Sequence, residues 1–150
     1  MKYIIPALPP SDNKYKGRTN IWQYWEDKKD WEKLVFCHCR PRPDKPIPHA
    51  TVTLKYFFKT RVRHDPDNYS GKFILDGLVR CGILIDDSFD HVNLVLRGGY
   101  DKNNPRTEIE VEENDAKEQI CKYYSGATII QQDTGIVQME NGRRIELWNL

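Results

Sequence analysis

Two stretches of the chain decide the fold: residues 50–59, ATVTLKYFFK, and residues 64–87, HDPDNYSGKFILDGLVRCGILIDD. Apolar and polar side chains alternate in the first stretch, which is typical of a strand with one buried face. In the second, Pro66 indicates the first turn of a helix that continues to about Arg80. The apolar residues 83–85 then predict a short strand. A strand, a helix and another strand in this order indicate a domain built around a sheet.

The neighbouring segments predict further elements of the same sheet. The segment 40–48 contains four prolines and is expected to be an extended loop. We therefore predict an α+β fold, in which helices flank a mixed sheet, for a single domain over residues 1–112. The further elements are strands over residues 2–8, 92–96 and 106–111 and a helix over residues 19–35.

Residues 113–150 form a C-terminal extension of this expected domain. A helix is predicted over residues 112–124, and a β-hairpin is predicted around Asn141-Gly142, a dipeptide that favours tight turns between strands. We expect the extension to pack on the domain or to extend it.

The distribution of charge along the chain is more informative about binding partners than the net charge of +1. Residues 1–63 carry a net charge of +8 and residues 64–150 carry −7, counted from the printed sequence. A basic half suits contact with a polyanion such as DNA. The acidic half suits DNA only if its carboxylates hold metal ions. The other interpretation, which composition leaves open, is that the two oppositely charged halves pair with each other.

Composition excludes several other classes of protein. With 150 residues, 39% hydrophobic and 30% charged, the chain suits one globular domain rather than a disordered or membrane-embedded protein. The amino-terminal segment lacks the pattern of a signal peptide. The four cysteines lack a zinc-binding spacing, and Cys37-His38-Cys39 is read as ordinary packing. We expect a reduced, cytoplasmic protein.

Carboxylates gather in and after the predicted helix. One interpretation of Asp65 and Asp67 is purely structural, with Asp65 capping the helix and Asp67 stabilising its first turn. At helical spacing, however, a polar face is expected as well, and if the next strand packs beside the helix then Asp87 could meet Asp65 and Asp67. Three converging carboxylates repel one another unless a divalent cation neutralises them, and oxygen ligands favour Mg²⁺ or Mn²⁺. The residues of the expected polar face are Asp65, Asn68, Tyr69, Lys72 and Asp76.

A calcium-binding loop is the competing interpretation of the same carboxylates. It fits poorly, because Ser70 occupies the position that requires glycine and Asp76 replaces the final glutamate.

The pattern resembles that of the RusA family of Holliday junction resolvases, small endonucleases of phages and prophages. The family pattern is D-x-D-N, a lysine four residues later, an aspartate four further on, a glycine, an apolar strand and a D-D pair. The family also has an amino-terminal P-P-S-x-N loop, and the resemblance covers residues 4–112. The matching residues are Asp65, Asp67, Asn68, Lys72, Asp76, Gly82, Asp86 and Asp87, with Pro9, Pro10, Ser11 and Asn13 in the loop.

The resemblance implies a RusA-like homodimer that uses Mg²⁺ to cut four-way DNA junctions by paired, symmetric incision in recombination and repair. It implies that Asp65, Asp67 and Asp87 are catalytic metal ligands and that Lys72 is a catalytic cation. Asn68, Asp76 and Asp86 would support them. Phosphate contacts are expected from the basic half, namely from Lys14, Lys16, Arg18, Arg61 and Arg63.

Two alternatives stay open from the sequence. The protein could be a metal-dependent nuclease of other branched or duplex DNA, or a DNA-binding protein that keeps the fold without cleavage. The aromatic residues Trp22, Trp25 and Trp31 are expected in the core or in a dimer interface, because they follow helical spacing. No membrane partner is expected.

Overall fold

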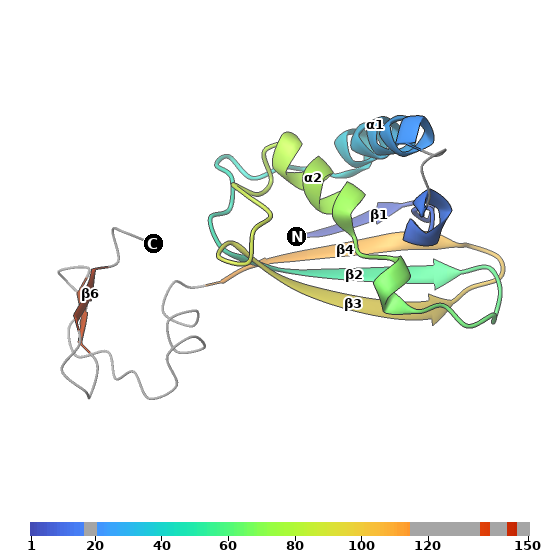
Figure 1. Cartoon of the computed structure of the whole chain (residues 1–150). Coiled ribbons are helices and arrows are strands. Elements are labelled where there is room, and N and C mark those ends of the chain that lie inside the picture. Colours follow the sequence, from blue (N-terminus) through green and yellow to red (C-terminus); the bar gives the residue numbers. More distant parts are fainter. Residues whose placement is uncertain (17–20, 115–135, 139–143, 147–150) are drawn as a thin grey trace. The chain divides into compact units, whose positions relative to one another are not determined.

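The computed structural model describes residues 1–16, 21–114, 136–138 and 144–146 (Figure 1). The chain forms two compact units, Met1–Glu113 and Asn114–Leu150. In the second unit, strands β5 (Ile136–Gln138) and β6 (Arg144–Glu146) pair antiparallel. The predicted Asn141-Gly142 turn and most of the predicted helix 112–124 lie outside the described residues. Residues 112 and 113 belong to a strand, so the helix prediction was wrong at its start.

The first unit is an α+β domain with a mixed four-stranded sheet, as the sequence predicted. The strand order is β1-β4-β2-β3. Strand β4 runs antiparallel to both β1 and β2, whereas β2 and β3 are parallel neighbours. The strands are β1 (Lys2–Ile5), β2 (Ala50–Phe58), β3 (Val92–Tyr100) and β4 (Arg106–Glu113).

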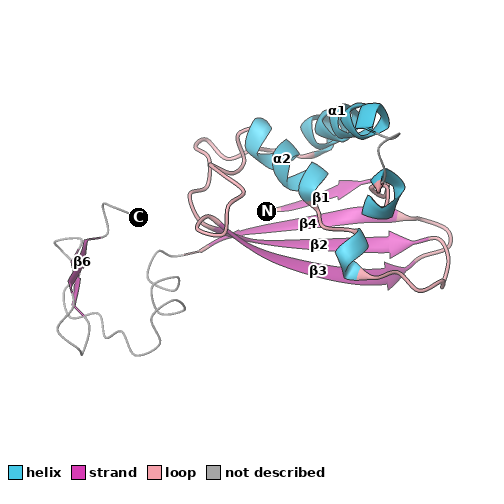
Figure 2. Ribbon diagram, viewed as in Figure 1, coloured by secondary structure: helices cyan, strands magenta, loops and turns pink. Residues whose placement is uncertain are grey.

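Helices α1 (Ile21–His38) and α2 (Lys72–Arg80) lie on one face of this sheet (Figure 2). The alternation of β2 is confirmed, because Val52 and Leu54 are fully buried while their neighbours are partly exposed. The two helices approach closely at Gly77, where an added Cβ would lie 2.9 Å from Cβ of Val35. Burial of apolar side chains between sheet and helices is the main stabilising contribution.

The predicted helix over residues 66–80 is interrupted. Pro66–Asn68 forms a short 3₁₀ helix, η2, and α2 begins only at Lys72. Between them, Gly71 has φ of +78°, a conformation that side chains other than glycine rarely adopt. The predicted polar helical face is therefore wrong, since of its five residues only Lys72 and Asp76 lie on α2. Gly71, which the sequence places inside the helix, is the residue before it.

Residues 83–85 are not a strand of the sheet. Ile83 and Leu84 are buried as the apolar pattern predicted. Leu84, however, forms only a single parallel bridge, with Ile47 in the proline-rich loop. The segment belongs to the connection between α2 and β3, in which Ile83 and Leu84 are buried and Ile85 is exposed.

The aromatic residues of α1 divide between core and surface. Trp31 is buried, whereas Trp22 is 81% exposed and Trp25 is 50% exposed, so the core prediction holds for Trp31 alone. At the end of α1, Cys37 is exposed and Cys39 is buried. None of the described helices combines the length and the apolar character needed to cross a membrane.

We expect the chain truncated after Glu113 to fold on its own. The four-stranded sheet, both helices and their core lie within Met1–Glu113, so the truncation keeps the contacts that these elements make with one another. Circular dichroism and urea unfolding should show native secondary structure and one cooperative transition. An insoluble product, or one without a cooperative transition, would contradict the expectation.

Gly71→Ala should destabilise the domain by about 3 kcal/mol, because it combines backbone strain with a clash. A Cβ at Gly71 would lie 2.5 Å from Cδ1 of Leu54, in the centre of β2. Gly82→Ala is the matched control, since Gly82 has a similar φ of +75° but no atom within 4 Å of an added Cβ. It should cost only about 1 kcal/mol in urea unfolding. Equal losses would show that the contact with Leu54 contributes nothing.

Candidate functional site

The acidic turn, which we define as residues 65–68, follows the carboxyl-terminal end of β2. Asp65 occupies the cap position of η2, but its side chain makes no capping hydrogen bond. Its carboxylate instead pairs with Arg63, with 2.9 Å between Oδ1 and Nε. Asp65 is half-buried and Asp67 is exposed. Both carboxylates of the turn can therefore be reached from solvent.

The amino-terminal loop, residues 9–13, lies against the chain that follows the acidic turn. The backbone N–H of Ser70 donates to Oδ2 of Asp12 across 3.4 Å. Residues from both segments, including Pro9, Asp12 and Lys72, line one shallow pocket. The structure thus brings together the two segments that carry the family resemblance, although they are far apart in the sequence.

Lys72 and Asp76 belong to a three-membered ion-pair cluster with Lys28 of α1. The carboxylate of Asp76 lies 3.3 Å from Nζ of Lys72 and 2.7 Å from Nζ of Lys28. Burial acts to raise the pKa of Asp76, but the hydrogen bond from Lys28 and the charge of Lys72 outweigh it, so the pKa lies below its ordinary value. Asp76 therefore orients the side chain of Lys72, the first residue of α2.

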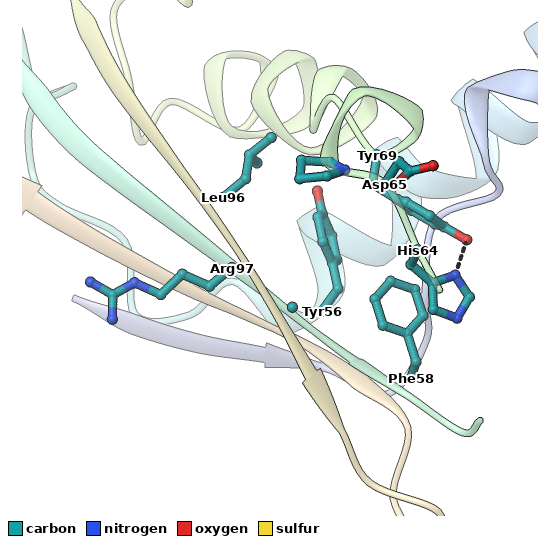
Figure 3. Close-up of a pocket in the computed structure, with 9 residues that line it drawn as sticks. Tyr56, Phe58, His64, Asp65, Tyr69, Leu96 and Arg97 are labelled. Carbon is teal, nitrogen blue, oxygen red and sulfur yellow. Dashed lines mark hydrogen bonds between the residues drawn. The ribbon is translucent and has the colours of Figure 1, made fainter. Parts of the chain in front are cut away.

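A small aromatic cavity of about 50 Å³ lies beside the acidic turn, between η2 and strands β2 and β3 (Figure 3). The imidazole of His64 stacks on Phe58 with 3.7 Å between ring centroids. The Tyr69 hydroxyl points to Nδ1 of the same imidazole, at 3.4 Å. Arg97 also lines the cavity, but its side chain extends away from Asp65 in Figure 3. These aromatic contacts fix the backbone from which Asp65 projects.

Three buried polar atoms near the acidic turn lack a hydrogen-bond partner within the described part of the chain. They are the hydroxyl of Tyr56, Nε2 of His64 and Oδ1 of Asn68. Burial raises the pKa of Tyr56, and the negative charge of Asp12 adds to the shift, so this hydroxyl stays protonated. A buried acceptor without a partner is costly unless a ligand or water satisfies it. The oxygen donors Asp65, Asp67 and Asn68 suit a hard divalent cation such as Mg²⁺.

The Asp86–Asp87 pair lies at the other end of the parallel strands. It precedes the first residue of β3, whereas the acidic turn follows the last residue of β2, and the two strands pair from Ala50↔Val92 to Phe58↔Tyr100. Figure 1 shows the connection from α2 to β3 at the end of the sheet opposite η2. Among the described residues, no three His, Cys, Asp or Glu side chains form a group that could hold a metal. One chain therefore does not bring Asp87 to Asp65 and Asp67.

Asp86 has a local partner of its own. A hydrogen bond from the Ser88 side chain lowers the pKa of Asp86, and the backbone N–H of Asp87 adds to the effect. The turn continues with hydrogen bonds from the backbone N–H groups of His91 and Val92 to the Ser88 carbonyl. Asp86 thus shapes the turn that leads into β3 and orients its neighbour Asp87.

The predicted phosphate-binding residues differ in their surroundings. Lys14 pairs with Asp27 at 2.7 Å, and Arg63 pairs with Asp65. The guanidinium of Arg61 lies 4.6 Å from the centre of the Tyr100 ring. Lys16 is exposed, and Arg18 lies outside the described residues. Of the predicted phosphate-binding residues, Arg63 lies at the acidic turn and Arg61 lies at the nearby end of β3.

Three residues of this region were missed by sequence reasoning. Asp12 occupies the variable position of the amino-terminal loop, so the family pattern gave no signal for it. A lysine on a helix is ordinarily expected at its exposed side, yet Lys28 of α1 pairs with Asp76 of α2. Tyr56 was predicted only as a buried strand residue, and nothing in the alternation indicates that its hydroxyl lacks a partner.

The sequence matches no model of a known protein family and no curated protein. The assignment of a function therefore depends on the residues and on their geometry.

Asp76→Asn should lower the free energy of unfolding by about 1 kcal/mol near neutral pH, because it leaves Lys28 and Lys72 without their shared carboxylate. Folding lowers the pKa of Asp76. Its carboxylate therefore contributes fully to the free energy of unfolding above its pKa in the unfolded chain, about 4, and this contribution is lost as the pH falls through the lower pKa of the folded state. The stability difference from the wild type should therefore be constant above about pH 5 and should shrink as the pH falls below about 4 in urea unfolding.

Asp30→Asn is the matched control for this measurement. Asp30 pairs with Lys33 on the same helix α1, but both side chains are largely exposed. Such a pair contributes little, so Asp30→Asn should change the stability by less than about 0.5 kcal/mol. A pH-independent loss for Asp76→Asn, or an equal loss for both variants, would contradict the role of the Asp76 cluster.

Proposed function

We propose that this protein is a Mg²⁺-dependent endodeoxyribonuclease of the RusA type, a homodimer that cuts branched DNA and resolves four-way junctions by paired incision. The observation that carries the proposal is the contact between the amino-terminal loop and the chain after the acidic turn, through Asp12 and Ser70. Both segments of the family pattern meet there, and Lys72 begins α2 at the same place. Carboxylates, a lysine and basic flanking residues are the groups that phosphodiester hydrolysis requires.

The proposed chemistry assigns a role to each group. Asp65 and Asp67 would hold the metal ion, which supplies activation of a water molecule and charge stabilisation at the phosphate. Oδ1 of Asn68, which has no hydrogen-bond partner among the described residues, would provide a further oxygen ligand or bind a water molecule beside the metal. The exposed ammonium of Lys72, oriented by Asp76, would stabilise the negative charge that develops on the phosphate. Arg61 and Arg63 would contact the neighbouring phosphates of the strand.

Asp87 has a defined place in this proposal only in a dimer. Because it lies at the opposite end of the strand pair, a metal held by all three carboxylates would take Asp87 from a second copy of the chain. A homodimer with two-fold symmetry also matches the approximate two-fold symmetry of a four-way junction. Two such sites would act on two opposed strands and give symmetric cuts.

A DNA-binding protein without cleavage is the second candidate function. The observation in its favour is that the described part of a single chain holds no group of three metal-ligating side chains. The two candidates differ in one measurable property, the Mg²⁺-dependent incision of DNA.

Asp67→Asn should abolish Mg²⁺-dependent cleavage of a synthetic four-way junction and leave junction binding within about threefold of the wild type. The substitution removes one metal-binding charge but no basic contact. Gel shift without metal measures binding, and denaturing electrophoresis of end-labelled strands measures cleavage. Asp44→Asn, in the exposed proline-rich loop, is the control and should keep both properties.

Three outcomes would count against the proposal. Binding without cleavage by the wild type would favour the non-catalytic alternative. Cleavage that persists in Asp67→Asn would remove this residue from the site. Loss of binding together with cleavage, in a variant that is folded by circular dichroism, would give Asp67 a role other than metal binding.

A further inference from the structure

Strand β3 is the last strand of the sheet, and its outer edge has no partner among the described strands. The hydrogen bonds from the Ala50 N–H to the His91 carbonyl and from the Asp101 N–H to the Phe58 carbonyl fix which backbone groups face β2. In a parallel pair these groups belong to alternate residues, here the odd-numbered ones. The backbone N–H and C=O groups at the open edge therefore belong to Val92, Leu94, Leu96, Gly98 and Tyr100.

Within the described residues, the opposite edge of the sheet is protected, whereas the edge at β3 is not. Strand β1 has only four residues, begins with the charged Lys2 and is followed at once by Pro6. Strand β3 has nine residues, contains no proline and carries one charge, on Arg97. Proteins normally shield such an edge with charge, proline or short length, because unpaired backbone groups recruit another strand. A long open edge with three half-buried apolar residues, 94–96, fits pairing with a further strand.

The two ends of β3 carry opposite charge. Asp86 and Asp87 lie in the turn that leads into its first residue, Val92. Arg97 lies near its last residues, and Arg61 stacks on Tyr100 at the very end. When two copies of such a strand pair antiparallel, the acidic end of each meets the basic end of the other, and the attraction occurs twice. A parallel arrangement would bring like charges together.

We propose that β3 pairs antiparallel with the β3 strand of a second copy of this chain, so that two four-stranded sheets join into one continuous sheet. The residues that face the open edge allow a register in which Leu96 lies on the two-fold axis and Val92 pairs with Tyr100 of the partner subunit. This register uses all nine residues of both strands. This pairing would form the dimer surface of the homodimer in the proposed function. To that extent the inference rests on the proposed function.

The proposed register makes a contact that can be tested on the sheet face without helices. There Val95 lies opposite Arg97 of the partner subunit, as a pair without backbone hydrogen bonds, in which the Cα atoms are about 4.5 Å apart. That distance lies within the range that a disulfide bridges. Two cysteines placed at these positions in different chains should therefore form a disulfide.

The experiment mixes two single variants of the full chain, Val95→Cys and Arg97→Cys, each combined with Cys37→Ser to remove the exposed thiol. After oxidation, non-reducing electrophoresis should show cross-linked dimer in the mixture and far less with either variant alone. Asn93→Cys mixed with Arg97→Cys is the register control, and it should not cross-link. Cysteines common to all samples contribute equally to every lane.

A charge pair at the same position provides a second measurement. Val95→Arg places two like-charged pairs across the two-fold axis and should weaken dimerisation about tenfold in sedimentation equilibrium. Val95→Glu is the matched control, because it faces Arg97 of the partner subunit with the opposite charge and should dimerise at least as tightly as the wild type. Both substitutions lie on an exposed face, so both variants should fold.

The outcomes separate this inference from the proposed function. A wild-type protein that stays monomeric up to its solubility limit overturns the pairing. A dimer without the cross-link, and with equal affinity in Val95→Arg and Val95→Glu, also overturns it and points to another surface. A cross-linked β3 dimer without nuclease activity contradicts only the proposed function, and an active nuclease without the cross-link contradicts only this inference.

Discussion

The contact between Gly71 and Leu54 determines how the polar part of this domain meets its core. At this point the chain leaves the acidic turn in a left-handed conformation and passes directly over the side chain of Leu54, in the middle of β2. The short distance leaves no room for a side chain at Gly71. Since α2 begins at the next residue, this contact also sets where the helix starts and which of its faces is buried.

The elements around the acidic turn depend on that arrangement. Because α2 begins at Lys72, Asp76 pairs with both Lys72 and Lys28 of α1. This ion pair links the two helices, which also approach closely at Gly77 and Val35. The turn itself is fixed by aromatic packing on one side and by Asp12 on the other. In the proposed function, the solvent-accessible carboxylates of this turn would bind the cation, and the packing around the turn would hold them in position for hydrolysis.

The local sequence pattern was sufficient to predict the four strands of the sheet and the class of fold. The alternation in residues 50–59 predicts β2 because burial of every second side chain is a property of the strand itself. The break before α2 could not be predicted in the same way, because Asp65 and Pro66 favour a helix locally and only the contact with Leu54 requires the interruption. The apolar residues 83–85 illustrate the same limit, since burial alone does not distinguish a strand from a buried connection. Asp65 and Asp67 were identifiable from the pattern, but the position of Asp87 relative to Asp65 depends on topology, which one local pattern does not contain.

We propose that the acidic turn supports metal-dependent cutting of branched DNA at two symmetric positions. This proposal is tested by mapping the cuts in a synthetic four-way junction whose four strands are labelled in turn, with Mg²⁺ or with a chelator, beside a linear duplex of the same sequence. We expect Mg²⁺-dependent cuts at symmetry-related positions in two opposed strands and little cleavage of the duplex. Binding of the junction without any cut, or equal cutting of junction and duplex, would contradict it.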